Sequence, residues 1–501
     1  MIKTSIILMI CVFFSKIFGF LREIIIASYY GTTLSTDAFF VAQNIPTIAF
    51  AAIGAAISVA VIPIYTKLLK KDKNQASYFI NNLMTLSIIL TTFLMIICII
   101  FSKQIVFLVA PSLSGDGMEL ASKILKILSI TIYFTMFSYI LGGMLNSKNK
   151  FYVPQLAAIP YNIISVLFVM ILSKKLDIWA LVIGTIIGML LQTIVHIIPI
   201  TKFNKYKFIV DFKEKNLKKL WMLSWPMVVT VLFQQLNLVV DKNLASGFAV
   251  GSISAINYSN RIVGIIYGIF SVSLMTVLYS KFNEFIIDKK KSNVFSLLIK
   301  SLNIVLLVTL PFTIISLIFN SSVVSIVFGR GAFDANSVAM TSEVYKYYAL
   351  SIFSMAANDI ILRCYYSLDN SKTPMIITII GVIINVILSV LLSKWLGLKG
   401  LAIGTSIAMT IQTVLLFLAL KKKEKMMIRK DNYWDLFKIV ISGVIMYFIV
   451  HVLHIYLPIG NQIIKLFVVS IIGVLGYIVL LYIINLSMKN DLKKMLKRAR
   501  Y

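Results

Sequence analysis

Long apolar runs recur along the whole chain and are separated by short polar connections. A helix that spans a membrane needs about 20 mostly apolar residues. Only 13% of the residues are charged, against roughly 25% in soluble domains. We therefore predict an all-α polytopic membrane protein with fourteen transmembrane helices. Their expected starts lie near Ser5, Ala38, Tyr78, Ile124, Val153, Ile178, Leu220, Ser252, Val294, Glu343, Met375, Gly400, Leu436 and Leu466.

The formal net charge of +29 is concentrated in the connections that follow even-numbered spans. By the positive-inside rule, these connections and both termini are expected in the cytoplasm, and no cleavable signal peptide is evident. The basic inner face predicts contact with anionic membrane lipids rather than with nucleic acid. The basic residues concerned are Lys67, Lys70, Lys71, Lys73, Lys148, Lys150, the seven lysines from Lys202 to Lys219, Lys281, Lys289 to Lys291, the cluster from Lys421 to Lys430 and the tail from Lys489 to Arg500.

A repeat relates the two halves of the sequence, because four sets of residues match at one constant offset. Six predicted spans separate the copies, so both copies enter the membrane with the same orientation. Transporters place such parallel repeats around a central axis, with the substrate between them, and this arrangement implies alternating access. The matched pairs are Pro154 with Pro374, 171–174 with 391–394, 181–185 with 401–405, and Gln192-Thr193 with Gln412-Thr413.

The repeat predicts three parts of the chain. Residues 1–219 form an N-lobe of spans 1–6 and the following cytoplasmic loop. Residues 220–430 form a C-lobe of spans 7–12 and its following loop. Residues 431–501 contain spans 13 and 14, which lie outside the repeat, and a basic cytoplasmic tail.

Three ionisable residues, Lys16, Arg22 and Glu23, lie inside the first apolar run. A charge near the middle of a bilayer costs several kcal/mol unless it faces a partner or a water-filled cavity, so the cluster is a candidate functional site. The alternative is that Lys16 and Arg22 extend to the membrane interface. In the second lobe, Arg261 lies within the eighth predicted span.

Arginine suits a phosphate group because guanidinium offers paired donors and stays charged. An anion between Lys16 and Arg22 of one lobe and Arg261 of the other could bias both lobes. The alternative is internal pairing, for example of Arg22 with a neighbouring carboxylate. Further polar residues that could act as charge partners in the cavity are Glu23, Asp37, Asn260, Asp359 and Arg363.

A second polar constellation contains Asp241, Asn385, Ser389 and Thr405. Asn385 and Ser389 are four residues apart and therefore share a helical face. One carboxylate with amide, hydroxyl and carbonyl oxygens is an environment that suits a hard cation such as sodium. Interhelical hydrogen bonding without an ion is the simpler alternative.

The sequence contains no pattern typical of an enzyme. We find no nucleophile, metal-site or P-loop spacing, so no catalytic residue and no organic cofactor are expected. The three cysteines fall in or beside apolar spans, where cysteine behaves as a small hydrophobic residue. They are Cys11, Cys98 and Cys364, and the histidines His196, His451 and His454 do not cluster with carboxylates.

Several motifs follow one another along nearly the whole chain. The opening motif is Ser15-Lys16-Ile17-x-Gly19-x-x-Arg22-Glu23, followed by residues 36–42 (Thr-Asp-Ala-Phe-Phe-Val-Ala) and Pro46. Further motifs are Tyr258-Ser259-Asn260-Arg261, residues 328–333 (Phe-Gly-Arg-Gly-Ala-Phe), and residues 365–374 with Ser371-Lys372-Thr373-Pro374. In this order, the motifs resemble those of the MurJ/MviN family.

The resemblance implies a MATE-like fold of the MOP superfamily and the translocation of lipid II, the undecaprenyl-pyrophosphate-linked peptidoglycan precursor. It implies that the pyrophosphate binds at Lys16, Arg22 and Arg261, and that spans 13 and 14 form a groove for the polyprenyl tail. A sodium site would use Asp241, Asn385, the backbone carbonyl of Leu401, and Thr405. It also implies a multi-pass protein of the bacterial cytoplasmic membrane that acts in cell-wall biogenesis and cell shape.

The chain departs from the family pattern at four positions. The first family arginine is Lys16 here, which keeps the charge but loses the bidentate fork. A family arginine expected near Phe50 is absent, Ser389 replaces a second carboxylate that some members carry in the sodium site, and a basic position in span 10 appears as Asp359. These departures bear on the details of substrate and ion binding.

We predict from these observations a monomeric lipid II flippase that works by alternating access, coupled to sodium or to membrane potential. A flippase for another polyprenyl-pyrophosphate-linked glycan is the nearest alternative. A MATE-type cation antiporter would need a cavity dominated by carboxylates, and a non-transporting scaffold would tolerate mutations of the cavity.

Overall fold

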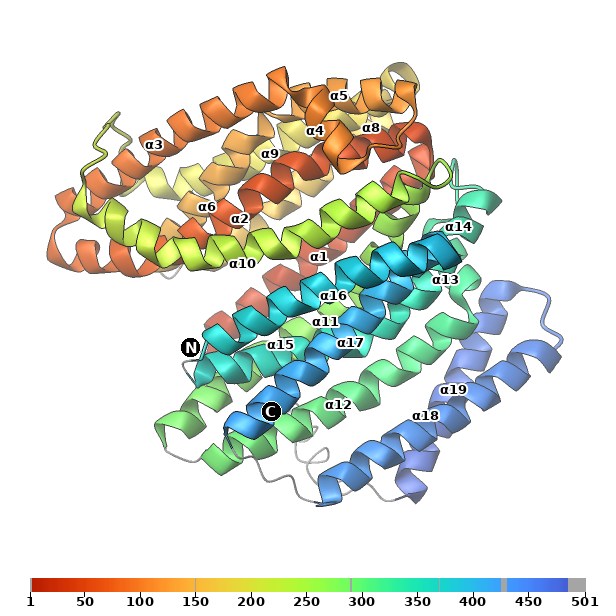
Figure 1. Ribbon diagram of the computed structural model, residues 1–501. Coiled ribbons are helices and arrows are strands. Elements are labelled where there is room, and N and C mark those ends of the chain that lie inside the picture. Colours follow the sequence, from red (N-terminus) through yellow and green to blue (C-terminus); the bar gives the residue numbers. More distant parts are fainter. Residues whose placement is uncertain (1, 149, 289–290, 369, 425–429, 485–501) are drawn as a thin grey trace. The chain divides into compact units, whose positions relative to one another are not determined.

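The computed structural model describes residues 2–148, 150–288, 291–368, 370–424 and 430–484, which form helices joined by short connections (Figure 1). No β-strand occurs among these residues. The first-half helices are α1 (Ile2–Tyr30), α2 (Leu34–Lys71), α3 (Lys73–Ile100), α4 (Ser102–Val109), α5 (Gly115–Leu128), α6 (Thr131–Ser147), α7 (Tyr152–Leu156), α8 (Ala158–Leu176) and α9 (Ile178–Thr201).

The helices of the second half follow the same order of long and short elements. They are α10 (Lys215–Ala245), α11 (Ser252–Ile287), α12 (Lys291–Ile318), α13 (Asn320–Phe328), α14 (Ala335–Tyr348), the 3₁₀ turn η1 (Ala349–Ser351), α15 (Ile352–Ser367), α16 (Lys372–Leu396) and α17 (Leu398–Lys423). Two further helices, α18 (Lys430–Tyr456) and α19 (Gln462–Ile483), end the described chain. The basic tail from Lys489 to Arg500 and part of the cluster from Lys421 to Lys430 lie outside the described residues.

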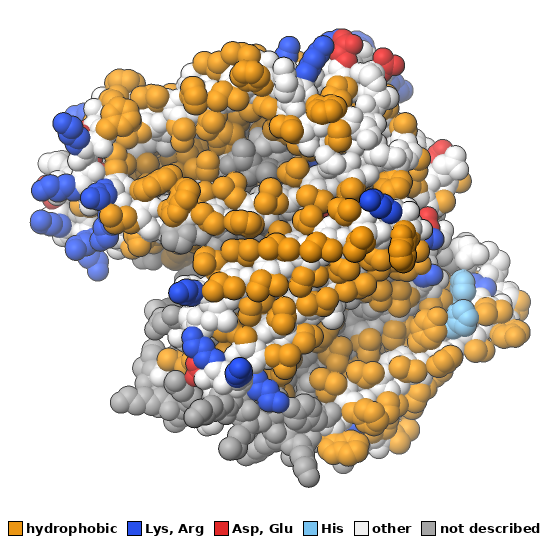
Figure 2. All heavy atoms as spheres, viewed as in Figure 1, with side chains coloured by type: hydrophobic (Ala, Val, Ile, Leu, Met, Phe, Trp, Pro, Cys, Tyr) orange, Lys and Arg blue, Asp and Glu red, His pale blue; other side chains and the backbone are white. Residues whose placement is uncertain are grey.

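Every predicted span start lies in one of these helices. Within the described residues, ten helices are long and apolar enough to cross a membrane, or eleven if α5 and α6, which meet at a bend of 46°, are counted as one span. In the view of Figure 2, hydrophobic side chains cover the flanks of the helices, whereas Lys and Arg gather near helix ends. The chain is therefore an all-helical, multi-pass membrane protein.

The chain forms two compact units, and the first contains residues 1–258 and 330–337. Within it α2 packs against α5, α6 and α10, while α8 packs against α1 and α9. The apolar core between α2, α3 and α6 includes the buried side chains of Tyr65, Phe79 and Ile140. Helix α10, which follows the predicted boundary at residue 219, thus packs within the first unit.

The second unit contains residues 259–329 and 338–501. Its helices α12, α15 and α17 enclose one core, and the hairpin of α18 and α19 packs beside α12 around a second core. Figure 1 shows α18 and α19 side by side. Tyr477 of α19 donates a hydrogen bond to the carbonyl oxygen of Leu307 at 3.2 Å, which fixes this hairpin on α12.

The repeat is visible in the local backbone of the two halves. Gly31 and Gly251 both have positive φ, at 58° and 92°, and they are related by the same offset as the matched sequence pairs. Asp177 and Gly397, with φ of 46° and 65°, are related by that offset too. Positive φ is costly for most side chains, so these two shared turns are specific features of the fold. The hydroxyl of Tyr30 donates to the carbonyl oxygen of Asp177 at 2.9 Å in the first copy.

The segment between α9 and α10, residues 203–213, is held along α3 by side-chain hydrogen bonds. The side chain of Asn82 both donates to the carbonyl of Asp211, at 2.7 Å, and accepts from its backbone N–H, at 2.8 Å. Asn81 donates to the carbonyl of Lys205 at 3.1 Å. Because Asn81 and Asn82 are buried, these bonds satisfy polar groups that would otherwise be costly to bury.

Candidate functional site

The charged cluster of α1 contains a buried ion pair between two adjacent residues. Arg22 and Glu23 are 7% and 2% exposed, and Arg22 Nη2 lies 2.7 Å from Glu23 Oε1. The structure therefore shows the internal pairing that the sequence left open as an alternative. Lys16 lies on the same helix, and its side chain is exposed.

The guanidinium of Arg22 also lies over the ring of Tyr161, with 4.8 Å between Cζ and the ring centroid. Tyr161 belongs to α8, which packs against α1. Its hydroxyl is 3.5 Å from the side-chain nitrogen of Gln43 on α2, which can donate to it. Tyr161 could not be predicted as a site residue from the sequence, because an aromatic residue in an apolar span carries no signal of its own.

Arg22 keeps one donor outside these contacts. Its Nε is buried and has no hydrogen-bond partner. A buried donor without a partner is costly, and a bound water, ion or ligand can satisfy it. Beside the cluster, a Cβ at Gly19 would lie 3.7 Å from Asn162 Nδ2, an ordinary contact, so Gly19 faces α8 without being required for the packing of α1 on it.

Asp37, a predicted charge partner, caps the first turn of α11. Its carboxylate accepts hydrogen bonds from the backbone N–H groups of Gly251 and Ser254, both at 2.7 Å, and from the Ser254 hydroxyl. A negative charge at a helix N-terminus is favoured by the unpaired N–H groups and the helix dipole. Asp37 thus ties the start of α2 to the start of α11.

A segment of the second half, residues 330–337, docks on the same end of the first unit. The backbone N–H of Ala332 donates to the carbonyl of Ser28 at 2.7 Å. A Cβ at Gly331 would lie 2.1 Å from that carbonyl oxygen, so only glycine fits there. Thr32 donates to the Ser337 hydroxyl at 2.8 Å. We call this set of contacts, together with those of Asp37, the α1–α2 junction.

The aromatic ring of Tyr258 lies within the α1–α2 junction. It forms edge-to-face contacts with Phe40 and Phe333, at centroid distances of 5.6 and 5.5 Å. Asp334 accepts a hydrogen bond from the Ser337 backbone at 2.8 Å, and this bond holds the pKa of the Asp334 carboxyl below its ordinary value. The motif at residues 328–333 therefore has a defined structural role.

The remaining predicted charges lie in the second unit. Arg261 and Asn260 lie on α11; Arg261 is exposed and Asn260 is half-buried. Asp359 on α15 accepts a hydrogen bond from the Tyr267 hydroxyl, and Arg363 lies one turn further along the same helix. Lys16 and Arg22 belong to the first unit, so their joint action with Arg261 remains a proposal.

The predicted ion-site residues are also divided between the units. Asn385, Ser389, Leu401 and Thr405 lie on α16 and α17, whereas Asp241 lies on α10 of the first unit. Ser389 donates to Asn385 Oδ1 at 3.2 Å, and Thr405 donates to the Leu401 carbonyl at 3.0 Å. These four residues supply oxygen atoms that fit a hard cation. Among the described residues, no three His, Cys, Asp or Glu side chains form a metal-binding group.

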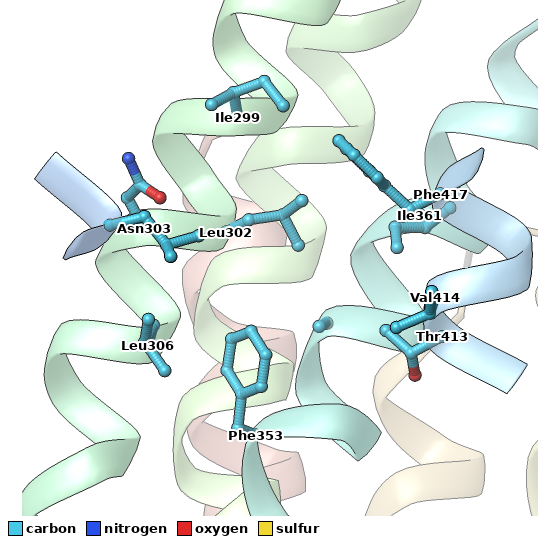
Figure 3. Close-up of a pocket in the computed structure, with 11 residues that line it drawn as sticks. Ile299, Leu302, Asn303, Leu306, Phe353, Ile361, Thr413, Val414 and Phe417 are labelled. Atoms are coloured by element: carbon cyan, nitrogen blue, oxygen red, sulfur yellow. The ribbon is translucent and has the colours of Figure 1, made fainter. Parts of the chain in front are cut away.

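An apolar cavity of about 230 Å³ lies within the second unit. Figure 3 shows Leu302 of α12, Phe353 of α15 and Phe417 of α17 extending into the same space. Leu436 of α18 completes the lining. The lining residues are Ile299, Leu302, Asn303, Leu306, Phe353, Ala357, Ile361, Thr413, Val414, Phe417 and Leu436.

Comparison with known sequences identifies related proteins along most of the chain. The family model described as "Lipid II flippase MurJ" matches residues 26–481. A probable lipid II flippase MurJ of Buchnera aphidicola subsp. Baizongia pistaciae is 31% identical over 436 residues, which cover 84% of each chain. The protein of the same description in Buchnera aphidicola subsp. Schizaphis graminum is 28% identical over 502 residues, 97% of each chain.

Comparison with solved structures agrees with the sequence relationships. A structure described as lipid II flippase MurJ in an inward closed conformation has a TM-score of 0.85 at 29% identity, and the match covers 95% of this chain and 98% of that chain. An inward-facing MATE family multidrug transporter of the MOP superfamily has a TM-score of 0.70 at 14% identity, covering 84% and 98% of the two chains. This second likeness shows the fold alone.

Proposed function

The chain belongs to the MurJ family of lipid II flippases, and on that premise we propose that it moves lipid II from the inner to the outer leaflet of the bacterial cytoplasmic membrane. The observation that carries the proposal, beside the family match, is the buried Arg22, whose Nε has no hydrogen-bond partner, inside a mainly apolar helix. A buried cation with an unused donor suits a lipid-linked pyrophosphate. A flippase forms no covalent bond with its cargo, so no catalytic residue is proposed.

We propose fourteen transmembrane helices in two parallel six-helix lobes followed by α18 and α19. The positive-φ turns that recur at equivalent positions of the two halves support the repeat. So does the recurrence of two shorter helices after α3 and after α12. The distribution of lysines supports cytoplasmic termini. A rocking of two such lobes would expose the central site to each leaflet in turn.

The pyrophosphate is proposed to bind Lys16, Arg22 and Arg261. Within the first unit, a phosphate oxygen would replace Glu23 as the partner of Arg22 or bind the Nε donor. Arg261 would supply a cation from the second half. Because both halves contribute, the ligand would favour the state in which they are closest.

The α1–α2 junction is proposed as the outer gate. Both α1 and α10 end there, at the ends away from the lysine-rich connections. The junction joins Asp37 and Ser28 of the first half to Ser254 and Ala332 of the second. Its bonds would break as the transporter opens outward and reform as it returns.

The cavity of the second unit is proposed to hold part of the polyprenyl tail. Its lining is almost wholly hydrocarbon, and burial of apolar surface favours a hydrocarbon ligand. Leu436 of α18 lines it, which gives the helices outside the repeat a role in tail binding.

A sodium ion is the proposed coupling ion, with membrane potential as the alternative. Asp241, Asn385, Ser389, Leu401 and Thr405 would hold the ion through oxygen atoms. A bound cation would neutralise Asp241 and would thereby change the balance between the two states of the transporter.

The transporter is proposed to act as a monomer.

Anionic lipids are proposed to contact the lysine-rich end of the first unit. Lys148 Nζ and Lys150 Nζ lie 3.9 and 5.6 Å from the centroid of the Phe203 ring. Burial, together with the charges of Lys73 and Lys150, holds the pKa of the Lys148 ammonium below its ordinary value. A phosphate headgroup would relieve the repulsion among these three lysines.

The experiment that tests this function uses a bacterium depleted of its own lipid II flippase. Expression of this chain should restore growth and the exposure of lipid II at the outer leaflet, measured with a membrane-impermeant enzyme that cleaves lipid II. Exposure of a different polyprenyl-linked glycan, without exposure of lipid II, would favour the nearest alternative.

A further inference from the structure

We propose that Tyr161 is a positioning residue that holds the guanidinium of Arg22 through a cation–π contact and so fixes where Arg22 meets the pyrophosphate. The inference rests on the proposed function, because it assigns Arg22 to the pyrophosphate. Tyr161 is a neutral residue on α8, a second helix beside the charged residues of α1.

The contact between Arg22 and Tyr161 has the geometry of a cation–π interaction. Arg22 Cζ lies 4.8 Å from the Tyr161 ring centroid, within the range of a cation–π interaction. A cation–π interaction depends on the positive charge of the guanidinium over the ring and is not confined to a single N–H donor. Tyr161 can therefore hold the Arg22 side chain in place beside α8.

Glu23 holds the same guanidinium through an ion pair. It occupies an edge donor, Nη2, at 2.7 Å. A phosphate that binds at this edge competes with Glu23 but not with Tyr161. The ring contact thus persists when the ionic partner is exchanged, and it keeps Arg22 in one position through the exchange.

The position of Tyr161 is itself determined by a glycine on α9. A Cβ at Gly188 would lie 2.8 Å from Tyr161 Cδ2 and 2.8 Å from its carbonyl oxygen. Contacts this short force a shift of the ring or of the α8 backbone. The absence of a side chain at Gly188 therefore leaves the room that Tyr161 occupies.

The repeat shows that this pair is particular to the half that carries Arg22. At the offset that relates Pro154 to Pro374, Tyr161 matches Gly381 and Gly188 matches Ala408. The second half thus has a small residue at both positions. A Cβ at Gly381 would lie 2.4 Å from Gln412 Oε1, so a different side chain fills the space there.

The test measures binding of farnesyl pyrophosphate to the full-length purified protein by calorimetry. Tyr161→Leu should weaken binding by about 2- to 30-fold, the range expected from loss of a cation–π contact. Tyr161→Phe keeps the ring but removes the hydroxyl that Gln43 contacts, and it should weaken binding less than Tyr161→Leu does. Gly188→Ala should weaken binding in the same direction, because it displaces the ring.

Matched controls separate positioning from a general defect of folding. Gly142→Ala adds a Cβ only 3.8 Å from Pro154, an ordinary contact, and should leave binding unchanged. In an Arg22→Ala background, Tyr161→Leu should have no further effect on binding. If Tyr161→Leu does not fold, Tyr161→Met supplies similar volume without a ring and carries the same expectation.

Two failures can be told apart. Unchanged binding by Tyr161→Leu, with loss of binding by Arg22→Ala, would overturn the positioning role and keep the pyrophosphate site. Unchanged binding by Arg22→Ala would instead overturn the proposed site of the pyrophosphate. A further loss from Tyr161→Leu in the Arg22→Ala background would contradict an action through Arg22.

Discussion

Asp37 accepts a hydrogen bond from the backbone N–H of Ser254 at 2.7 Å, across 217 residues of sequence. The contact joins the first turn of α2 to the first turn of α11, which belong to opposite halves of the repeat. Because one carboxylate of α2 accepts all of these bonds from the first turn of α11, separation of the two helices would break the bonds together. This property suits a gate that opens once in each transport cycle.

Removal of the Asp37 carboxylate should open the outer gate more often. Asp37→Ala leaves buried N–H groups without an acceptor, at a cost of about 1–3 kcal/mol to the closed junction. A cysteine at Thr32, in a background with the three native cysteines replaced, should then react faster with a membrane-impermeant maleimide. Asp116→Ala, at an exposed position of α5, serves as the control, and equal rates in all variants would contradict the gate.

A methyl group at Gly331 should disrupt the same junction from its other side. The added Cβ would meet the Ser28 carbonyl oxygen at 2.1 Å and strain a backbone with φ of 62°. We expect Gly331→Ala to abolish growth rescue while the protein still reaches the membrane. Gly115→Ala, whose Cβ would meet nothing within 4 Å, should rescue fully. Full rescue by Gly331→Ala would show that the contact is dispensable.

The hydrogen bonds of Asn82 should protect the α9–α10 segment from proteolysis. Asn82→Ala removes both bonds to Asp211 and leaves buried backbone groups unpaired, at a cost of about 1–3 kcal/mol. Limited trypsin digestion should then cut faster after Lys205 and Lys207, which are exposed. The exposed Asn74 provides the control Asn74→Ala. Equal cleavage rates would show that other contacts hold the segment.

A bulky residue in the apolar cavity should weaken binding of the polyprenyl tail and leave binding of the pyrophosphate unchanged. Ala357→Phe places a ring in the cavity of about 230 Å³ and should weaken binding of a long polyprenyl pyrophosphate. Binding of inorganic pyrophosphate should stay the same, because the cationic residues are unchanged. Leu418→Phe on the exposed face of α17 is the size control. An equal loss for both ligands would assign the effect to folding.

The helices could be predicted from the sequence because the apolar runs are long, and the structure places a helix at every expected start. Ten or eleven of the described helices are long and apolar enough to span a bilayer. Breaks in the helices, such as the bend between α5 and α6, could not be predicted from the sequence, because no proline or glycine marks that bend. The backbone turns at Gly31 and Gly251 follow the repeat that the sequence revealed.

The candidate site was predictable only in its charges. Arg22 and Glu23 are conspicuous in an apolar helix, and the structure shows their pairing. Tyr161 was missed because its role depends on the packing of α8 against α1, which no local pattern reveals. The partners of Asp37 likewise depend on contacts between distant segments. Sequence periodicity specifies which residues share a helix face, but not which helix faces meet.

The most direct test of the central claim measures lipid II at the outer leaflet of flippase-depleted cells that express arginine variants of this chain. With Arg22→Ala or Arg261→Ala at normal membrane abundance, we predict that lipid II stays protected from the impermeant cleaving enzyme and that growth is not restored. A double variant of the exposed pair Glu119 and Lys123, Glu119→Gln with Lys123→Gln, should expose lipid II as the unmodified chain does. Normal exposure of lipid II with either arginine variant would contradict the account.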